Sequence, residues 1–583
     1  MPAKLAVATV TASDDDGNGP RSTIDGATGT RWSAKGKGQW IEWDLGSVQR
    51  LSQVRIAFYE GDSRINTFDI DVLDGTTSTR VLEGRTSSGE TVGFETFDFP
   101  PVSGRFVRYT GHGSNVGLWN SLTEAEVWSA DGGGEHEHET GTPGLVTYPK
   151  PSPSTLKTST VYTVSARQPQ QAAKPVFTEQ FTKGRTIHVA GFSCAGEVEI
   201  TIAALTQPLK LPRISPRSRQ LDQHVTQVDD KTVKFTITKP QKLILFPTTT
   251  GGKELDPLYL FADPLEDPAT TATHEFGPGV HDQGVTVGSD ETVHIAGGAV
   301  VNGKIAIKDG AQRVKIHGRG LLQISEEFEI DGCTSVKIEG ITIRNLTGDP
   351  DPDDHHNGDW TTRIRRSTDV TVHGVKVFSF AETTDGIDPD GSTKVTISDC
   401  LLSTGDDCIA IKSTQETGKP TATIRVLDSV LETYPGRGGV GGDGVKIGTE
   451  TFEDIHDVRV ERCDVVRCFG ENDIGGHSAF SIVHKHDAKI SDVRYTDIHV
   501  EADIDHKDFE IISKANGSVS EVTLTNINWA KPKLIKLSGN DVSDVTFQNC
   551  TVGTGDHPRL LTSVQDDPLD VADDIAPTVK FLP

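Results

Sequence analysis

The sequence has no run of 18 or more apolar residues, which excludes an ordinary membrane-spanning helix. Basic residues are scarce, 57 against 84 acidic ones, and the formal net charge is −27. Such a surface repels nucleic acid and polyanionic membranes, so neither is an expected partner. The seven cysteines form no CxxC pair, so a zinc site is not expected, whereas one or two disulfides stay open.

What the chain does have is glycine, proline and short runs of β-branched residues. It contains 59 glycines and 29 prolines in 583 residues. This mixture is typical of an all-β protein with many turns. The length predicts two to four structural units.

The first unit spans residues 1–130 and alternates strand patterns with Gly-rich turns. It resembles the discoidin-like (factor 5/8 C-type) β-sandwich, a carbohydrate-binding module, through Asp25-Gly26, Thr30-Arg31-Trp32, Trp40, Trp43 to Gly46, Arg108-Tyr109 and Glu124 to Trp128. The resemblance implies a structural calcium ion held by Asp25, Thr30 and Glu124. Hard oxygen ligands from two loops suit calcium.

Two further segments precede the last unit. Residues 131–160 are rich in Gly, Pro, Ser and alternating Glu-His, and they predict a flexible linker. Residues 161–272 alternate apolar and polar positions between Pro and Gly turns, which predicts a small β-sandwich.

Residues 273–583 carry a repeat of short V-x-I/V/L/F triplets in steps of 22 to 35 residues. The triplets begin at Val314, Val336, Val370, Val395, Ile424, Val458, Val493, Val522 and Val545. A period in the twenties with intruding loops indicates a parallel β-helix, whose apolar residues point into the tube. The predicted fold is therefore all-β: a right-handed parallel β-helix preceded by two β-sandwich domains.

Three carboxylates in this unit are spaced by one coil. Asp406 and Asp407 follow Asp385 by 21 and 22 residues (406 − 385 and 407 − 385). Residues one coil apart stack on neighbouring rungs, so the three should converge on one outer face, roughly 5–10 Å apart. Like-charge crowding raises at least one pKa. One protonated and one ionised carboxyl group suit glycosidic bond hydrolysis, with inversion where they stand roughly 6.5–9.5 Å apart. Asp388 in "GIDPDGS" is instead expected in a turn.

The stretches "TTDGIDPDGSTKVTISDC" and "STGDDCIAIKS" resemble glycoside hydrolase family 28, the polygalacturonases and rhamnogalacturonases. The resemblance covers about residues 275–550. It implies an inverting hydrolase in which Asp406 is the general acid, and Asp385 and Asp407 hold and deprotonate the attacking water. No cofactor is expected for catalysis.

Other motifs depart from the family pattern. Thr383 replaces the Asn of Asn-Thr-Asp, Asp443 stands at the His of Gly-His-Gly, and "SIVHK" replaces Arg-Ile-Lys. The family's basic residues grip a uronate carboxylate, and lysine does not reproduce the two-pronged arginine contact. The predicted substrate-binding residues are therefore mixed in charge: Asp443, Lys485, His484, Trp360 and Lys412. Trp360 closes the acidic loop 348–360, which also contains His355 and His356.

Several functions stay open. A pectin-type glycan follows from the resemblance, whereas the altered uronate motifs favour a neutral glycan such as dextran, another α-glucan or a galactan. A non-catalytic glycan-binding β-helix and a polysaccharide lyase are less favoured, since a lyase needs an Arg or Lys base beside calcium-bound uronate. The expected partner is a polysaccharide, and the expected location is secreted or cell-surface, with the signal peptide trimmed from this chain. The oligomeric state is not predicted.

Overall fold

The computed structural model describes the whole chain except residues 1–3, 6, 8, 26–28, 75–76, 130–143, 154–155, 268–270, 349–357, 435–440, 470–477, 502–506, 515, 554–557 and 583. The described residues form β-strands and four short 3₁₀ helices, with no α-helix among them. The chain divides into two compact units, Met1–Glu139 and Thr140–Pro583.

The first unit is the predicted β-sandwich. Its longest strands pair antiparallel, and register shifts along both of them let the sheet fold over its own core. That core contains Trp32, Trp43 and Tyr109, all at most 1% exposed. The elements are β1 (Lys4–Leu5), β2 (Thr9–Ala12), η1 (Pro20–Thr23), β3 (Trp32–Lys35), β4 (Gln39–Phe58), β5 (Asn66–Asp74), β6 (Thr77–Thr86), β7 (Phe94–Ser114) and β8 (Trp119–Ser129).

The second unit begins with the predicted small β-sandwich. One sheet contains β9 (Gly144–Thr147), β10 (Lys157–Thr158), β13 (Thr178–Lys183), β14 (Arg185–Ala195), β16 (Lys210–Ser215), β19 (Gln241–Thr248) and β20 (Leu258–Asp263). The other contains β11 (Tyr162–Arg167), β12 (Lys174–Val176), β15 (Val198–Ala204), β17 (Thr226–Gln227) and β18 (Thr232–Ile237). Two 3₁₀ helices, η2 (Arg217–Arg219) and η3 (Leu221–His224), precede β17.

The predicted linker 131–160 needs correction over its described part. Strand β9 pairs with β14, and β10 pairs with β13, so both belong to the sandwich. Leu145 is 6% exposed and joins the sandwich core. The local composition, rich in Gly, Pro and Ser, did not reveal the burial of Leu145, because its partners lie in strands much later in the chain.

The rest of the second unit is a parallel β-helix, as predicted. Successive coils contribute strands to three long parallel sheets. The first sheet contains β21 (His274–Phe276), β24 (Thr292–Ile295), β27 (Gln312–Gly318), β30 (Thr334–Glu339), β33 (Thr368–His373), β36 (Thr393–Ser398), β39 (Thr421–Leu427), β42 (Ile455–Glu461), β45 (Lys489–Thr496), β48 (Ser518–Val519), β49 (Val522–Thr525), β52 (Val545–Gln548) and β56 (Lys580–Leu582).

The second sheet contains β22 (Gly279–His281), β25 (Ala299–Val301), β28 (Leu321–Ile324), β31 (Thr342–Asn345), β34 (Lys376–Phe378), β37 (Leu401–Thr404), β40 (Val430–Thr433), β43 (Asp464–Arg467), β46 (His499–Val500), β50 (Asn528–Trp529), β53 (Thr551–Val552) and β54 (Arg559–Leu560). The third contains β29 (Phe328–Asp331), β32 (Thr362–Arg365), β35 (Ile387–Asp390), β38 (Ile409–Ser413), β41 (Val445–Thr451), β44 (Ser478–His484), β47 (Lys507–Ser513), β51 (Ile535–Gly539) and β55 (Leu569–Val571). Strands β23 (Val285–Val287) and β26 (Ile305–Ile307) pair separately, and η4 (Ala576–Thr578) lies near the end.

The triplet repeat sets the register of the first sheet. Its nine predicted starting residues, from Val314 to Val545, pair with one another coil by coil. All are at most 1% exposed. A residue with positive φ directly precedes each of them, for example Lys394 (φ 54°) before Val395. This left-handed corner turns the chain into the sheet and costs roughly 1–2 kcal/mol per residue, which the buried ladder offsets.

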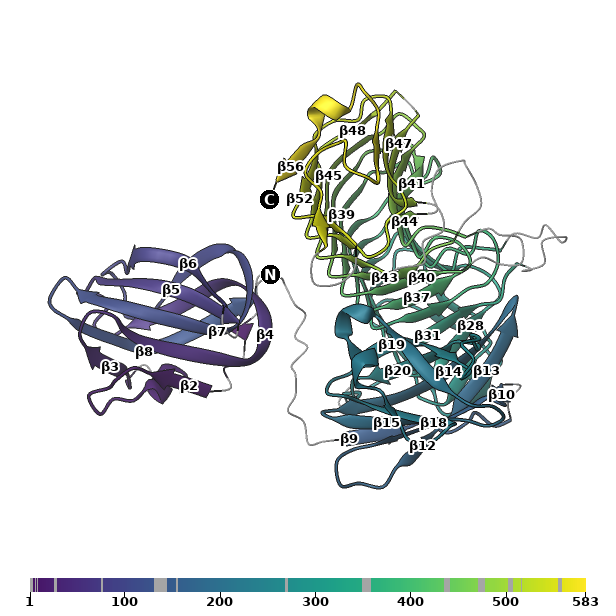
Figure 1. The fold of residues 1–583 in the computed structure, drawn as a ribbon, viewed down its shortest axis with the longest axis horizontal. Coiled ribbons are helices and arrows are strands. Elements are labelled where there is room, and N and C mark those ends of the chain that lie inside the picture. The colour runs from purple at the N-terminus through teal and green to yellow at the C-terminus, as the bar shows by residue number, and fades with distance from the viewer. Residues whose placement is uncertain are drawn as a thin grey trace. The chain divides into compact units, whose positions relative to one another are not determined.

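The small sandwich packs on the second sheet of the β-helix, and the two are not separate bodies (Figure 1). A shared apolar cluster joins strands β14, β19 and β20 to β34, β37, β40 and β43 through Ile187, Ile244, Phe246, Tyr259, Phe261, Phe378, Phe380, Leu401, Val430 and Val466. The third sheet carries no such cover from the sandwich strands that form this cluster. Catalytic candidates on the third sheet therefore keep an outer face of their own.

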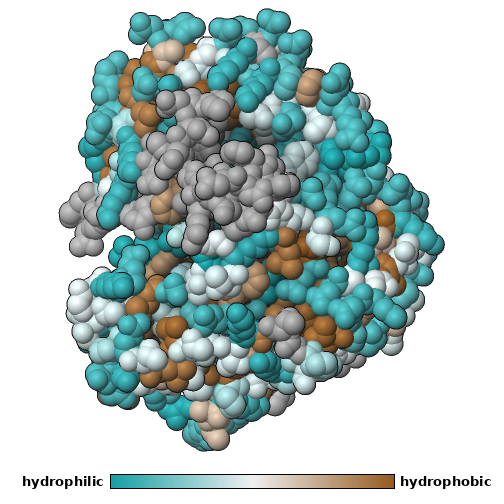
Figure 2. Space-filling model, turned by 90° about the vertical axis from the view of Figure 1, so that its right-hand side faces the viewer, coloured by the Kyte–Doolittle hydropathy of each residue, from teal (hydrophilic) through white to brown (hydrophobic). Residues whose placement is uncertain are grey.

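All seven cysteines are buried and free, so no disulfide forms. No helix among the described residues is long and apolar enough to cross a membrane. On the face drawn in Figure 2, hydrophobic residues stand in small groups among hydrophilic ones.

Candidate active site

The carboxylates of the predicted trio lie where the chain enters the third sheet. Asp385 and Asp407 each stand two residues before the isoleucines that pair β35 with β38. Asp443 stands two residues before Val445, which pairs β38 with β41. The backbone continues this register, because Gly386 N donates to Asp407 O at 2.8 Å. The three aspartates therefore form one column along the tube.

The structure brings Asp385, Asp406 and Asp407 together, as the coil spacing predicts. One carboxylate oxygen from each lies within 4.8 Å of the others. Asp385 and Asp407 are 2% and 3% exposed, whereas Asp406 is partly exposed. Asp406 is thus the member of the trio best placed to meet a substrate.

Two lysines face the trio. Lys412 Nζ donates to Asp385 Oδ2 at 2.7 Å. Lys446 Nζ lies 3.2 Å from Asp407 Oδ2 and 3.5 Å from Asp443 Oδ2. Lys412 was predicted from the sequence and Lys446 was not, although the place of Lys446 between the inward-facing Val445 and Ile447 indicates an outward side chain. Each lysine thus places a positive charge beside the carboxyl groups of the site.

Asp388 is a further carboxylate of the site that sequence reasoning missed. It lies inside strand β35, not in the predicted turn, and it is fully buried. Its nearest cation is Lys412 Nζ at 3.6 Å, and neither carboxylate oxygen makes a hydrogen bond with a described residue. Burial raises its pKa well above the usual range, and the charges of Asp385 and Asp407 add to the shift against Lys412. The raised pKa favours the protonated, neutral form of Asp388.

Asp443 corrects the prediction of a substrate contact. Its side chain is fully buried, and its carboxylate accepts hydrogen bonds from Ser478 N and from Ser481 Oγ, the latter at 3.0 Å. Its own backbone N donates to Asp407 Oδ1 at 2.8 Å. Burial raises the pKa of Asp443 to about 7, against the attraction of Lys446. Asp443 lies behind the trio and holds Lys446 and Asp407 in place.

The pKa shifts differ among the aspartates of the trio. Burial, with the charges of Asp385 and Asp407, raises the pKa of Asp406 well above its usual range. The backbone N–H groups of Thr383 and Asp407 each donate to Asp406 at 3.0 Å and favour its ionised form, but burial outweighs them. Burial also raises the pKa of Asp385, whereas Lys412 opposes that shift. A protonated Asp406 beside lysine-paired carboxylates is an arrangement able to protonate a leaving oxygen and activate a water.

Family models match both parts of the chain. The model described as glycosyl hydrolases family 28 matches residues 322–566, and the F5/8 type C domain model matches residues 8–125. The catalytic candidates thus lie in a region that is similar to glycosyl hydrolases family 28. The family 28 region holds every carboxylate and lysine of the site described above.

Relatives match shorter stretches. A probable polygalacturonase of Vitis vinifera is 30% identical over 182 residues, 30% of this chain and 33% of that protein. A probable polygalacturonase of Arabidopsis thaliana is 41% identical over 89 residues, 15% of this chain and 18% of that protein. The chain thus spans a third or less of the length of these relatives. Dex49A from Penicillium minioluteum has 14% identity and a TM-score of 0.53, covering 75% of this chain and 96% of that one, which is a likeness of fold.

Trp360 lies beside the family 28 site, as predicted. Its ring centroid is 3.6 Å from Lys412 Nζ and 4.9 Å from Arg363 Cζ. The next residue, Thr361, donates its backbone N–H to Asp385 O at 2.8 Å, which fixes the end of the loop against the column. Most of that loop, with His355 and His356, lies outside the described residues.

The two basic candidates of the "SIVHK" motif separate. His484 is fully buried, and its Nδ1 bonds Ser513 Oγ at 2.8 Å, so it lies within the coil and not at an open surface. Lys485 is exposed, and its pKa is lowered by burial of part of the side chain and by Lys446 and Lys514. Only Lys485 remains a candidate for contact with a sugar.

The calcium candidates share one end of the F5/8 type C domain. Thr30 Oγ1 donates to Asp25 Oδ2 at 2.8 Å. Glu124 is 6% exposed on β8, the strand that pairs with β3 just after Thr30. Carboxylate and hydroxyl oxygens are ligand types that calcium prefers.

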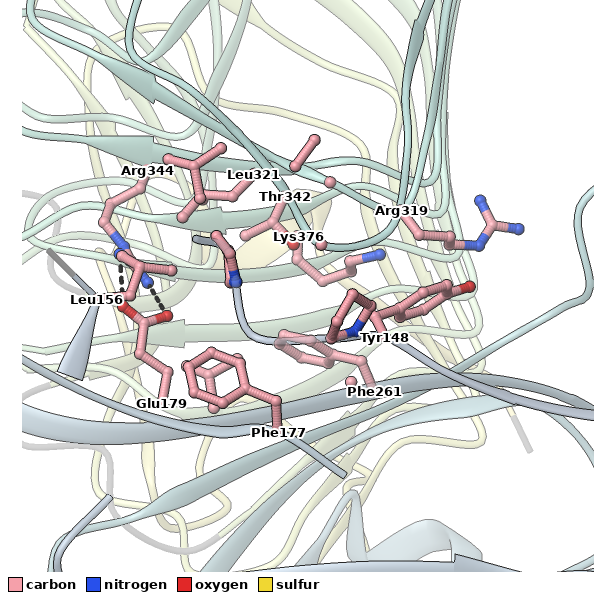
Figure 3. A pocket seen from close by; sticks show the side chains of 18 of the residues that line it. Tyr148, Leu156, Phe177, Glu179, Phe261, Arg319, Leu321, Thr342, Arg344 and Lys376 are labelled. Atoms are coloured by element: carbon pink, nitrogen blue, oxygen red, sulfur yellow. Dashed lines mark hydrogen bonds and ion pairs between the residues drawn. The ribbon is translucent and has the colours of Figure 1, made fainter. Parts of the chain in front are cut away.

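The cavity between the small sandwich and the β-helix is a different place (Figure 3). Its volume is about 110 Å³, whereas ligand pockets usually reach roughly 300–1,000 Å³. Four of its charged residues form ion pairs, Arg344 with Glu179 at 2.8 Å and Lys376 with Asp263 at 2.8 Å, and Arg319 donates to the backbone carbonyl oxygens of Gly318 and Pro264. It is therefore a packing gap in an interface and not the site of sugar chemistry.

Proposed function

We propose that the chain is a glycoside hydrolase that cleaves a pectin-type polysaccharide. The observation that carries this proposal is the convergence of the carboxylates of Asp385, Asp406 and Asp407 in the region that matches family 28, where the pKa of Asp406 is raised and this residue is partly exposed. A packing role does not account for the cost of crowding buried carboxyl groups. A polymer of this size does not cross membranes, so we also propose that the enzyme acts outside the cell or at its surface.

The proposed reaction is a single displacement. Asp406 gives its proton to the glycosidic oxygen as the bond from that oxygen to the anomeric carbon breaks. A water held by Asp385 and Asp407 attacks the same carbon and gives one of these carboxylates its proton. Lys412 and Lys446 lie beside these two carboxyl groups, at 2.7 Å from Asp385 Oδ2 and 3.2 Å from Asp407 Oδ2. The family resemblance implies inversion at the anomeric carbon. The stereochemistry of the product is the measurement that tests this.

Substrate charge is the finer part of the proposal. Exposed Lys485 supports recognition of an acidic sugar, whereas the missing arginine of "SIVHK" favours a neutral glycan. Lys412 and Lys446 are engaged by carboxylates, so they contribute less to binding a uronate. Trp360 offers a ring on which a sugar of either kind can stack.

A glycan panel tests the activity. Purified protein is incubated with polygalacturonan, methyl-esterified pectin, rhamnogalacturonan, galactan and dextran, and new reducing ends are counted. We expect pectin-type glycans to be cut, with the initial product anomer inverted in a time-resolved NMR spectrum. An unsaturated, ultraviolet-absorbing product would identify a lyase instead, and best turnover on dextran or galactan would identify a neutral-glycan hydrolase. No reducing ends from any glycan would leave a binding protein.

We further propose that the F5/8 type C domain binds carbohydrate and holds one calcium ion through Asp25, Thr30 and Glu124. Calcium titration during thermal melting of the full chain should raise the first melting transition. Glu124→Gln should remove that shift, whereas Glu126→Gln, on the same strand, should keep it. Equal shifts in both variants would contradict the site.

A further inference from the structure

A histidine pair on the first sheet of the β-helix, far along the chain from the carboxylate column, has the makings of a metal centre. His294 on β24 and His317 on β27 pair in register on adjacent coils, and their rings stack with centroids 4.8 Å apart. Glu266, from the segment after β20, reaches His294 Nε2 at 3.1 Å. One nitrogen or oxygen from each of the three lies within 4.8 Å of the others.

We propose that Glu266, His294 and His317 bind a divalent transition-metal ion, with zinc as the best fit. Two imidazoles and a carboxylate form the three-ligand set of zinc sites that keep a fourth position open. Harder ions such as calcium and magnesium prefer all-oxygen sites. The three side chains are all partly exposed, so an ion has a path to them.

An orphaned nitrogen supports the proposal. His317 Nε2 is buried and has no hydrogen-bond partner among the described residues. A neutral imidazole with a free nitrogen is the form that binds metal.

A second carboxylate is already in the position of an outer partner. Glu275, one coil earlier than His294, bonds His294 Nδ1 at 2.8 Å, so Nε2 faces Glu266. Metal-binding histidines usually donate their other ring N–H to a carboxylate in this way, which fixes the ring and its tautomer. Glu266 and Glu275 also supply negative charge against Lys315, which is paired with Glu339 at 2.8 Å.

The three side chains must move slightly closer together to bind one zinc ion. Tetrahedral zinc with bonds of roughly 2.0–2.1 Å separates its ligand atoms by about 3.3 Å. The His294–Glu266 distance already meets this, and the remaining ligand distances must shorten by up to roughly 1.5 Å, within reach of side-chain rotation. Because Glu266 comes from the segment that leaves the small sandwich, the ion would tie that segment to the first coils and stabilise this end of the tube.

The test uses the full chain without an affinity tag, stripped by a chelator and titrated with zinc chloride in a calorimeter and in thermal melts. The His-Glu run at residues 135–139 also attracts metal, so His136→Ala/His138→Ala removes that background. In this background we expect one zinc per chain and a higher melting temperature, both lost in His294→Ala and His317→Ala. Glu275→Gln should weaken binding by about 10–100-fold. Exposed His456 on β42 provides the matched control, His456→Ala, which should bind as before.

The same protein loaded with cobalt gives a readout that a plain ion pair does not. Visible d–d absorption of tetrahedral intensity should appear, and it should vanish in Glu266→Gln, a near-isosteric change that keeps the fold. Zinc stoichiometry and melting shifts equal in the background protein and in the histidine and Glu266 variants would overturn the proposal. In that case the contacts are a His–Glu ion pair only.

Discussion

The β-helix buries charge in two regions, and the two treat it differently. Where the β-helix meets the small sandwich, Glu432 is fully buried. Its carboxylate accepts hydrogen bonds from Arg467 Nε at 2.5 Å and Ser403 Oγ at 2.6 Å, and Arg185 Nη2 lies 3.4 Å away. Burial opposes its ionisation, yet Arg467 and Arg185 lower its pKa to about 2. In the carboxylate column, acids outnumber bases and Asp388 has no hydrogen-bond partner among the described residues.

Comparison of the two regions indicates which buried charged groups stabilise the fold and which serve chemistry. Where every charge has a partner, as around Glu432, the pKa falls and the group joins two layers of the fold. Where carboxyl groups crowd together, as around Asp406, the pKa of that group rises, which favours a proton held for chemistry. Burial alone does not distinguish the two regions, whereas the balance of partners does.

The largest expected effect is loss of turnover in Asp406→Asn. This change keeps the shape but removes the proton for the leaving oxygen, so kcat should fall about 10²–10⁴-fold on the best glycan. The melting temperature should hold or rise, because like-charge crowding is relieved. Asp541→Asn, at an exposed turn with φ 51°, is the matched control and should keep full activity. Normal turnover in folded Asp406→Asn would remove Asp406 from the mechanism.

At the interface between the β-helix and the small sandwich, we expect a loss of stability without a loss of turnover. Glu432→Gln leaves Arg467 and Arg185 buried without their anion and should cost about 3–5 kcal/mol of stability. The melting temperature of the second unit should drop accordingly, while kcat per folded molecule should stay close to normal. The control is Asp428→Asn, which breaks an ion pair between Arg462 and Asp428, whose side chain is 50% exposed. This variant should lose less than about 1 kcal/mol of stability. Equal losses in both variants would mean that burial of the pair is irrelevant.

The pH dependence of stability should have opposite signs in the two regions. Asp443, with a pKa of about 7 when folded, holds a proton that the unfolded chain releases near pH 4. The free energy of unfolding should therefore fall as pH rises from about 4 to about 7, by an amount on the order of a few kcal/mol. Asp443→Asn should flatten this fall, as melting curves at pH 5 and pH 8 would record.

Glu432 contributes stability above its unfolded pKa of about 4.3, and this is lost as pH falls toward about 2. Glu432→Gln should flatten only the acidic part of the curve of stability against pH.

If Asp443→Asn and wild type melted along parallel curves between pH 5 and pH 8, the raised pKa of Asp443 would be wrong.

The smallest expected effect is that of Asp388→Asn. A protonated aspartic acid and an asparagine are both neutral and similar in shape, so stability should change by less than about 1 kcal/mol. Melting temperature and kcat measured together would show whether Asp388 is a neutral filler. A large loss of stability would mean that Asp388 is ionised and that Lys412 depends on it.

Much of the fold follows from local pattern. The ladder from Val314 to Val545 and the pairing of Asp385 with Asp407 were predicted, because side-chain alternation and coil length are properties of adjacent residues. Leu145 was missed, because its burial depends on strands far along the chain.

The sequence by itself determined a parallel β-helix and the meeting of three aspartates on it. Only the tertiary structure decided that Asp443 is buried, that Lys446 faces Asp407, and that Asp388 lies in a strand without a hydrogen-bond partner among the described residues. Coil spacing fixes which residues stack, since it repeats along the chain. Desolvation and charge pairing depend on neighbours from other coils and on the sandwich, and no local pattern encodes those distances.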